Sequence, residues 1–277
     1  MKQLVYILLF FGFGLNAQIH VPYPKVITTT NSYITYLTSS GGGRPAALVV
    51  YAISNFINAE TAAGDWGNIS RLWVFGQDNT SNAVIDLTNN VAATLVNSPT
   101  FTAYQGYKGN GTSMYINSNF PLSSTSQNST SYGVFKRSNV SESSVVDMGI
   151  YISSIPNYSQ LNGNQGGVTY MYVNETSGSN YISIATAPTG KVFFVGQRTG
   201  ASATALWNNG TQVGTGTTTS ASVSSTYNYF IMARDANATA TQWNGSDQFS
   251  LAFIGNGTLS QTKLWNSVNN LATALGW

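Results

Sequence analysis

Carboxylates are the side chains in this sequence best able to do acid–base chemistry, and the 277 residues contain only nine of them. Glycoside hydrolysis needs two carboxyl groups placed on either side of the scissile bond. No Glu-x-Asp-x-x-Glu pattern or similar strand-borne pair is present, although Asp235 and Asp247 flank one loop. Asp147 is expected on a strand, facing solvent or hydrogen bonded. We therefore predict no catalytic residue and no enzyme, with a glycan-degrading hydrolase as the alternative.

Side chains that bind metals or act as nucleophiles are scarcer still. The chain has no cysteine and a single histidine, His20. Disulfides and thiolate metal sites are therefore excluded, and a Ser-His-Asp triad has little support. Calcium prefers oxygen ligands, which Asp235, Asn237, Asn244 and Asp247 could supply from one loop. Asp and Asn are also ordinary turn residues, so we predict no metal site and no cofactor, with Ca²⁺ as the alternative.

Aromatic rings next to amide and carboxyl groups are suited to carbohydrate binding, because a ring stacks on the C–H face of a sugar. Such a group occurs in the loop around Trp243. Two tyrosines spaced two residues apart share one face of a strand. The predicted glycan-binding residues are Trp243, Asn244, Asp247, Tyr170 and Tyr172. For the two tyrosines, the alternative is a structural role in covering the sandwich.

The charge of the chain is low and nearly balanced. Eleven Lys and Arg face nine Asp and Glu, and 7% of the residues are charged against roughly 25% in an average soluble domain. Hydrophobic residues make up 42%, which is enough for a core. The absence of a basic excess argues against nucleic acid as a partner. We expect a cell-surface or environmental glycan instead, with virion proteins or further copies of the chain, such as a trimer, as possible protein partners.

The N-terminus resembles an export signal. Residues 1–17 read MKQLVYILLFFGFGLNA, with Lys2 as the positive region, an apolar run from Leu4 to Leu15, and the small residue Ala17 at the end. The apolar run is shorter than the ~20 residues of a membrane span. We predict a cleaved signal peptide, and hence a secreted or virion-surface protein without a membrane anchor; the alternative is an uncleaved anchor.

Helices are expected at both ends of the mature chain. Residues 18–63 form an extended and helical lead-in segment, in which apolar spacing predicts an amphipathic helix over 46–62. A second helix follows Ser260, and Gly276 ends it. This closing helix has one apolar stripe, formed by Leu264, Val268, Leu271 and Leu275.

Residues 64–277, which include this closing helix, have the sequence pattern of an all-β domain. Short β-branched and aromatic runs alternate with turns such as Asn209-Gly210 and Asn256-Gly257. About ten short strands at this spacing predict a sandwich or barrel. The predicted strands cover residues 72–76, 113–116, 132–137, 144–151, 168–173, 181–185, 191–197, 203–207, 226–234 and 248–254.

Three stretches resemble the concanavalin A-like (LamG-type) jelly-roll proteins of phage tails and fibres and of some secreted bacterial proteins. They are the Gly-x-Trp and strand at 64–75, the Ser-Pro-x-Phe and Gly-Tyr-x-Gly-Asn-Gly segment at 98–116, and the ending at 230–260. The hairpin at 205–213 is similar to a LamG hairpin. Asn110 and Asn117 depart from the family, which often has Asp there.

The resemblance implies an all-β, concanavalin A-like jelly-roll sandwich with an N-terminal helical lead-in and a C-terminal helix. It also implies a surface or virion structural protein, of fibre or spike type. Combined with the aromatic and amide residues, it leads us to predict a glycan-binding, host-attachment role. A secreted bacterial adhesin is the alternative on the same scaffold.

Overall fold

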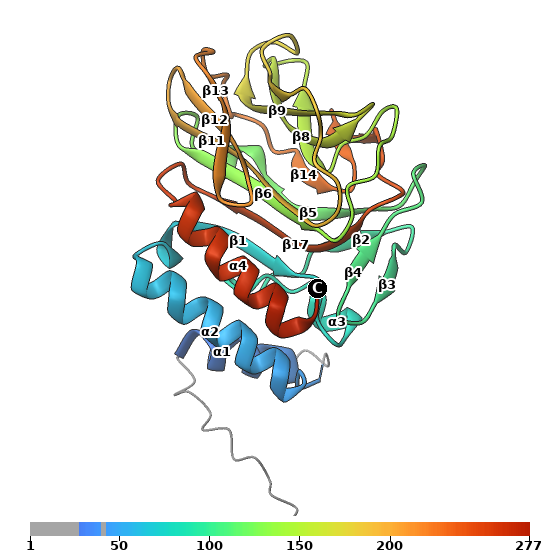
Figure 1. Cartoon of the computed structure of the whole chain (residues 1–277), viewed down its shortest axis with the longest axis vertical. Coiled ribbons are helices and arrows are strands. Elements are labelled where there is room, and N and C mark those ends of the chain that lie inside the picture. Colours follow the sequence, from blue (N-terminus) through green and yellow to red (C-terminus); the bar gives the residue numbers. More distant parts are fainter. Residues whose placement is uncertain (1–27, 40–42) are drawn as a thin grey trace, which may run out of the picture.

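The computed structural model describes residues 28–39 and 43–277, and this part of the chain forms two packed β-sheets with a layer of helices (Figure 1). The predicted signal peptide, 1–17, and the stretch 18–27 lie outside the described residues. The helical elements are α1 (Thr28–Ser39), α2 (Ala47–Ala63), α3 (Thr80–Ala83), α4 (Gln261–Leu275) and the short 3₁₀ turns Trp66–Asn68 and Leu122–Ser124.

One sheet, called here the helix-covered sheet, has eight strands within the described residues. Its order is β13-β12-β11-β6-β17-β4-β3, and β1 pairs with β17 beside β4. Its strands are β1 (Ile69–Val74), β3 (Thr100–Thr102), β4 (Gly106–Lys108), β6 (Thr130–Lys136), β11 (Val192–Gly200), β12 (Ala203–Asn208), β13 (Thr211–Gly216) and β17 (Gln248–Gly255).

The second sheet, called here the open sheet, has nine strands within the same described ranges. Its order is β10-β9-β8-β7-β14-β5-β2, while β15 runs parallel to β7 and antiparallel to β16. Its strands are β2 (Thr94–Val96), β5 (Tyr115–Pro121), β7 (Met148–Ile152), β8 (Asn157–Gln165), β9 (Val168–Glu175), β10 (Ile182–Ile184), β14 (Asn228–Ile231), β15 (Arg234–Ala236) and β16 (Thr239–Thr241).

The helix-covered sheet is buried on both faces, as consecutive residues show. Val134 of β6 contributes to the core between the two sheets, whereas Phe135 contributes to the core beneath the helices. Phe194 and Phe193 of β11 divide in the same way. Because successive side chains of a strand point to opposite faces, burial on both sides requires unbroken apolar runs. The sequence supplies them as Val-Phe-Phe-Val in β11 and Leu-Ala-Phe-Ile in β17.

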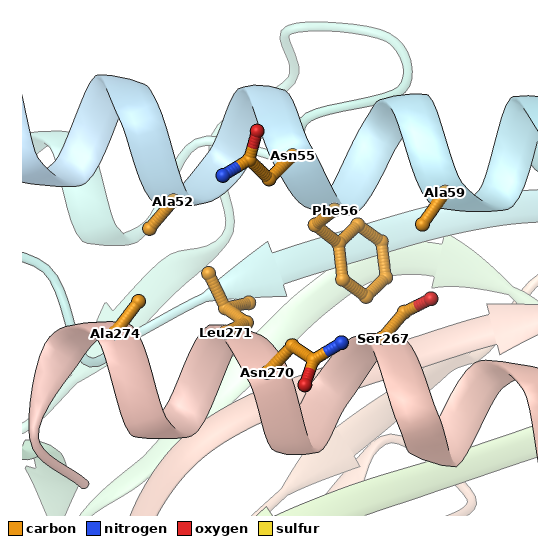
Figure 2. A pocket seen from close by; sticks show the side chains of 8 residues that line it. All are labelled: Ala52, Asn55, Phe56, Ala59, Ser267, Asn270, Leu271 and Ala274. Carbon is orange, nitrogen blue, oxygen red and sulfur yellow. The ribbon is translucent and has the colours of Figure 1, made fainter. Parts of the chain in front are cut away.

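Helices α2 and α4 lie side by side on the outer face of this sheet. Phe56 of α2 and Leu271 of α4 extend into the space between the two helices (Figure 2). A small cavity of about 80 Å³ is left beside them, lined in part by Ala52, Ala59 and Ala274.

The predicted fold class is confirmed: the chain is a β-sandwich with a C-terminal helix, preceded by helices. The helix expected over 46–62 is α2, and both α2 and α4 end at glycines with positive φ, 79° at Gly64 and 75° at Gly276. The division of the chain at residue 64 stays a prediction. No helix in the described ranges is long and apolar enough to cross a membrane.

Several local predictions differ from the structure, and the strands outside every predicted strand include β2, β3, β4, β13 and β16. Ser260 precedes α4 but makes no side-chain capping bond. Strand β8, with the sequence Asn-Tyr-Ser-Gln-Leu-Asn-Gly-Asn-Gln, lies outside every strand predicted from the sequence. Its polar composition gave no β signal, because Asn and Gly are depleted in strands in general.

Candidate functional site

The outer face of the open sheet lies on the opposite side of the molecule from the helices, and polar and aromatic side chains gather on it. Met171 and Val173 of β9 point into the core, so Tyr170 and Tyr172 between them point outward. The register with β8 places Gln160 opposite Tyr172 and Asn162 opposite Tyr170. Alternation on two neighbouring strands thus builds a face of tyrosines and amides.

This face contains a cavity of about 250 Å³. Its walls are contributed by β8, β9, β15 and the loops that adjoin them. The lining residues are Tyr158, Gln160, Asn162, Gln165, Tyr170, Tyr172, Gly178, Arg234 and Gln242. Three aromatic rings, four amides and one guanidinium group therefore surround the space.

The tyrosine rings support one another. The ring centroids of Tyr158 and Tyr172 are 6.0 Å apart, and those of Tyr170 and Tyr181 are 5.1 Å apart in an edge-on arrangement. The Tyr172 hydroxyl donates to the carbonyl of Gly178 at 3.3 Å. Burial, with a smaller effect of the neighbouring tyrosines, raises the pKa of Tyr172 to about 12, and burial also raises the pKa of Tyr158. These hydroxyls are therefore neutral hydrogen-bonding groups at physiological pH.

Arg234 enters the cavity from β15, which runs parallel to β7. Its Nε donates to Oγ1 of Thr241 at 3.2 Å, and its Nη1 donates to Oε1 of Gln160 at 3.3 Å. The guanidinium carbon also lies 5.5 Å from the centroid of the Tyr151 ring. Burial lowers the pKa of Arg234, but an arginine stays protonated in proteins. The cavity thus contains one fixed positive charge.

The site residues predicted from the sequence are divided between two places. Tyr170 and Tyr172 line the cavity. Trp243 is half-buried in the loop next to the lining residue Gln242 and does not itself line the cavity. Asn244 and Asp247 are fully buried. The glycan-binding role of all five stays a prediction, and only the two tyrosines share a cavity.

Asn244 and Asp247 belong to a buried ionic cluster, defined here as Lys136, Asp147, Asp247 and the amides around them. Nζ of Lys136 lies 2.8 Å from Oδ2 of Asp147 and 2.7 Å from Oδ2 of Asp247. Nδ2 of Asn244 donates to Oδ1 of Asp147 at 2.9 Å and to Oδ2 of Asp247 at 3.0 Å. Oδ1 of Asp247 also accepts from the backbone N–H of Val140 at 2.9 Å. The polar atoms of this cluster are used within the protein.

The sequence predicts that Asp147 either faces solvent or is hydrogen bonded. In the structure, Asp147 is fully buried and hydrogen bonded. Burial raises its pKa, Lys136 opposes this increase, and the Asp247 carboxylate adds to it. The same two carboxylates raise the pKa of Lys136 against the lowering effect of its burial. The ammonium group therefore stays charged between them.

The proposed calcium ligands also have partners within the protein. Asp235 is buried, and its Oδ1 accepts from the backbone N–H of Ala238 at 2.6 Å. Oδ1 of Asn237 accepts from the backbone N–H of Ser153 at 3.0 Å. In the described part of the chain, no three His, Asp or Glu side chains form a group able to hold a metal ion.

The sequence analysis missed Tyr158, Gln160, Asn162 and Arg234. The three β8 residues follow each other at a spacing of two, which is the spacing of one strand face. A strand prediction over 157–165 would have placed these three side chains together on one face of the sheet. Arg234 has no such local signal, because its place depends on pairing with a strand far earlier in the chain.

No protein-family model matches the chain, and no curated protein matches it in sequence. Among solved structures, it is similar to domain 4 of AbnA, a GH43 extracellular arabinanase from Geobacillus stearothermophilus, in complex with arabinotriose. The TM-score is 0.51 at 14% identity, covering 72% of this chain and 98% of that one. The receptor binding domain of a botulinum neurotoxin C/D mosaic is also similar, with a TM-score of 0.50 at 10% identity. That match covers 72% of this chain and 51% of the toxin domain. At these identities the likeness shows the β-sandwich fold alone.

The prediction that the protein is not an enzyme is wrong as stated. Solved structures that match the chain include Trypanosoma rangeli sialidase in complex with sialic acid, with a TM-score of 0.48 and 11% identity. The match covers 80% of this chain and 38% of the sialidase. A search for carboxylate motifs alone could not exclude catalysis. The match is structural and assigns no activity to this chain.

Proposed function

We propose that the protein binds a carbohydrate in the cavity on the outer face of the open sheet. The observation that carries this proposal is the combination of three tyrosine rings with four side-chain amides around about 250 Å³. A sugar ring has an apolar C–H face and hydroxyl groups at its rim. Aromatic rings suit the first, and amides, which both donate and accept hydrogen bonds, suit the second. Ligand cavities generally pair apolar walls with a few placed polar groups.

The dimensions and surroundings of the cavity support the same proposal. Its volume approaches the lower end of the range typical of small-ligand sites, about 300 Å³, so it suits one or two sugar units of a longer chain. The hydroxyls of Tyr158 and Tyr172 are neutral, and the helices lie on the far side of the sandwich. A long glycan can therefore extend past the cavity without meeting the helix layer.

A glycan array with the full chain tests the proposal. The wild-type protein should bind at least one class of glycan, and Tyr170→Ala should weaken that binding by about 10-fold or more, because it removes a stacking ring. Tyr172→Phe removes only a hydroxyl and should have a smaller effect. Tyr51→Ala is the matched control, since Tyr51 is exposed on α2 in the helix layer. The proposal fails if the wild type binds no glycan, or if Tyr170→Ala and Tyr51→Ala behave alike.

We also propose that this binding serves attachment outside the cell, on a virion or as a secreted bacterial adhesin. The signal-type sequence at 1–17 and the resemblance to LamG-type phage and secreted proteins support this role. Mass spectrometry of purified virions and of culture supernatant tests it. The chain should be enriched in one of the two, and recovery only from the cytoplasmic fraction would refute it.

A further inference from the structure

The two fully buried cations of the described residues, Arg198 and Lys136, contact carboxylates, whereas the half-buried Arg234 bonds to neutral groups. Arg198 donates from Nη2 to Oε1 of Glu175 at 2.8 Å. Lys136 lies between Asp147 and Asp247 in the buried ionic cluster. The hydrogen-bond and ring partners found for the Arg234 side chain are neutral: Gln160, Thr241 and Tyr151. Desolvating a charge is unfavourable unless an anion or hydrogen bonds compensate it, so a half-buried guanidinium group with neutral partners gains from binding an anion.

Two acidic residues that adjoin Arg234 or the residues lining the cavity are bonded elsewhere. Asp235 follows it in β15, but its Oδ1 accepts from the backbone of the adjoining turn at Ala238. Glu142 pairs with the lining residue Gln165, but its Oε1 accepts from the backbone N–H groups of Gly245 and Ser246. No Asp or Glu is among the described residues that line the cavity. The positive charge in the cavity is thus not neutralised by the protein.

Arg234 is also held in place. Gln160 and Thr241 accept hydrogen bonds from two of its nitrogens, and the Tyr151 ring lies beneath the guanidinium group. A side chain fixed in this way loses little conformational entropy when a ligand binds. A planar guanidinium group matches the two oxygens of a carboxylate, with which it forms short, charge-assisted hydrogen bonds.

We infer that the carbohydrate bound in this cavity is an acidic sugar, whose carboxylate pairs with Arg234 while its ring packs against the tyrosines. This inference rests on the proposed function and specifies the ligand class of the same site. The ligand supplies the anion that the protein lacks there. A neutral sugar of the same shape would leave the guanidinium group buried without an anion.

Binding measurements on matched pairs of ligands test the inference. The probes are galacturonic acid oligomers, glucuronic acid oligomers and sialyllactose, each compared with its methyl ester, which has the same shape without the charge. The full-length wild type should bind the acid form of at least one pair about 10-fold or more tightly than the ester, as expected for a charge-assisted pair. Arg234→Gln should lose this difference, and Arg234→Lys should keep part of it, because lysine retains the charge but not the fork geometry.

The controls separate this inference from the proposed function. Arg44→Gln, at an exposed arginine just before α2, should leave all affinities unchanged. Thermal unfolding should show that Arg234→Lys is folded, so that its affinities can be interpreted even if Arg234→Gln is unstable. Binding of neutral glycans or esters with no preference for acids would overturn the inference and leave the proposed function intact. An acid preference that survives in both Arg234 variants would overturn it as well. Binding of no glycan at all would refute both.

Discussion

The buried ionic cluster makes a strong prediction about stability. Lys136 is fully buried, and its Nζ contacts one oxygen each of Asp147, Asp247 and Asn139 within 2.8 Å. Lys136→Met keeps the length of the side chain but leaves two buried carboxylates facing each other. Removal of one partner from a buried ion pair costs about 3–5 kcal/mol. For domains of 150–250 residues, this corresponds to a decrease in Tm of roughly 6–20 °C.

The pH dependence of that decrease is the sharper test. Without the ammonium group, the folded-state pKa of Asp147 moves further above its ordinary value of 3.8. A carboxyl group with a raised folded-state pKa stabilises the fold at low pH, and this contribution is lost as the pH rises through the folded value. The stability deficit of Lys136→Met relative to wild type should therefore be largest at pH 7 and shrink toward pH 4, as measured by urea unfolding.

Two further variants complete the experiment. Lys108→Met changes an exposed lysine in β4 and should alter the free energy of unfolding by no more than about 0.5 kcal/mol. Adding Asp147→Asn to Lys136→Met removes one of the two stranded charges and should recover part of the lost stability. A deficit below about 1 kcal/mol at pH 7, or one that grows on acidification, would refute the reasoning, since a buried uncompensated charge predicts the opposite.

Three other changes have defined outcomes. Ala238 lies in the turn between β15 and β16 at a φ of 68°, which is unfavourable for alanine. Ala238→Gly should therefore raise the free energy of unfolding, measured in urea, by up to about 1 kcal/mol. An unchanged free energy would mean that the turn is unstrained. Burial raises the pKa of Asp235 to about 6, so wild-type stability should decrease as the pH rises from 3.8 to 6. Thermal unfolding of Asp235→Asn should lack this decrease. Parallel pH profiles of the two proteins would contradict the prediction. A Cβ at Gly163 would lie 2.2 Å from Oδ2 of Asp147, so Gly163→Ala should lower Tm by the equivalent of about 1–3 kcal/mol. Gly67→Ala is the control and should leave Tm unchanged, because the space around a Cβ at Gly67 is open.

The sequence was most informative where a strand or helix buries apolar side chains. The runs in β11 and β17 and the apolar stripe of α4 are local patterns, and each predicted its element to within a few residues. Strand β8 was missed because Leu161 is its one aliphatic residue. Its strand conformation depends on pairing with β7 and β9, which a local pattern does not contain.

The candidate site was predicted only in part for the same reason. Tyr170 and Tyr172 could be placed on one face from their spacing alone. The loop at 243–247 looked like a surface loop with a tryptophan and polar neighbours, but Asp247 bonds to Lys136, which lies 111 residues earlier in the chain. Contacts between such distant segments decide which polar residues are buried. Single-sequence patterns therefore identified the tyrosines and could not identify Arg234.

The helix layer covers one outer surface of the sandwich (Figure 1), and the cavity on the outer face of the open sheet lies on the opposite one, so the molecule has a built-in orientation. The first described helix, α1, begins at Thr28 on the helix side. A tether, tag or biosensor surface joined ahead of that residue would display the cavity outward to incoming ligand. Immobilisation through the exposed loops near Gly178 would mask it, so paired measurements on the two geometries would locate the binding face without any substitution.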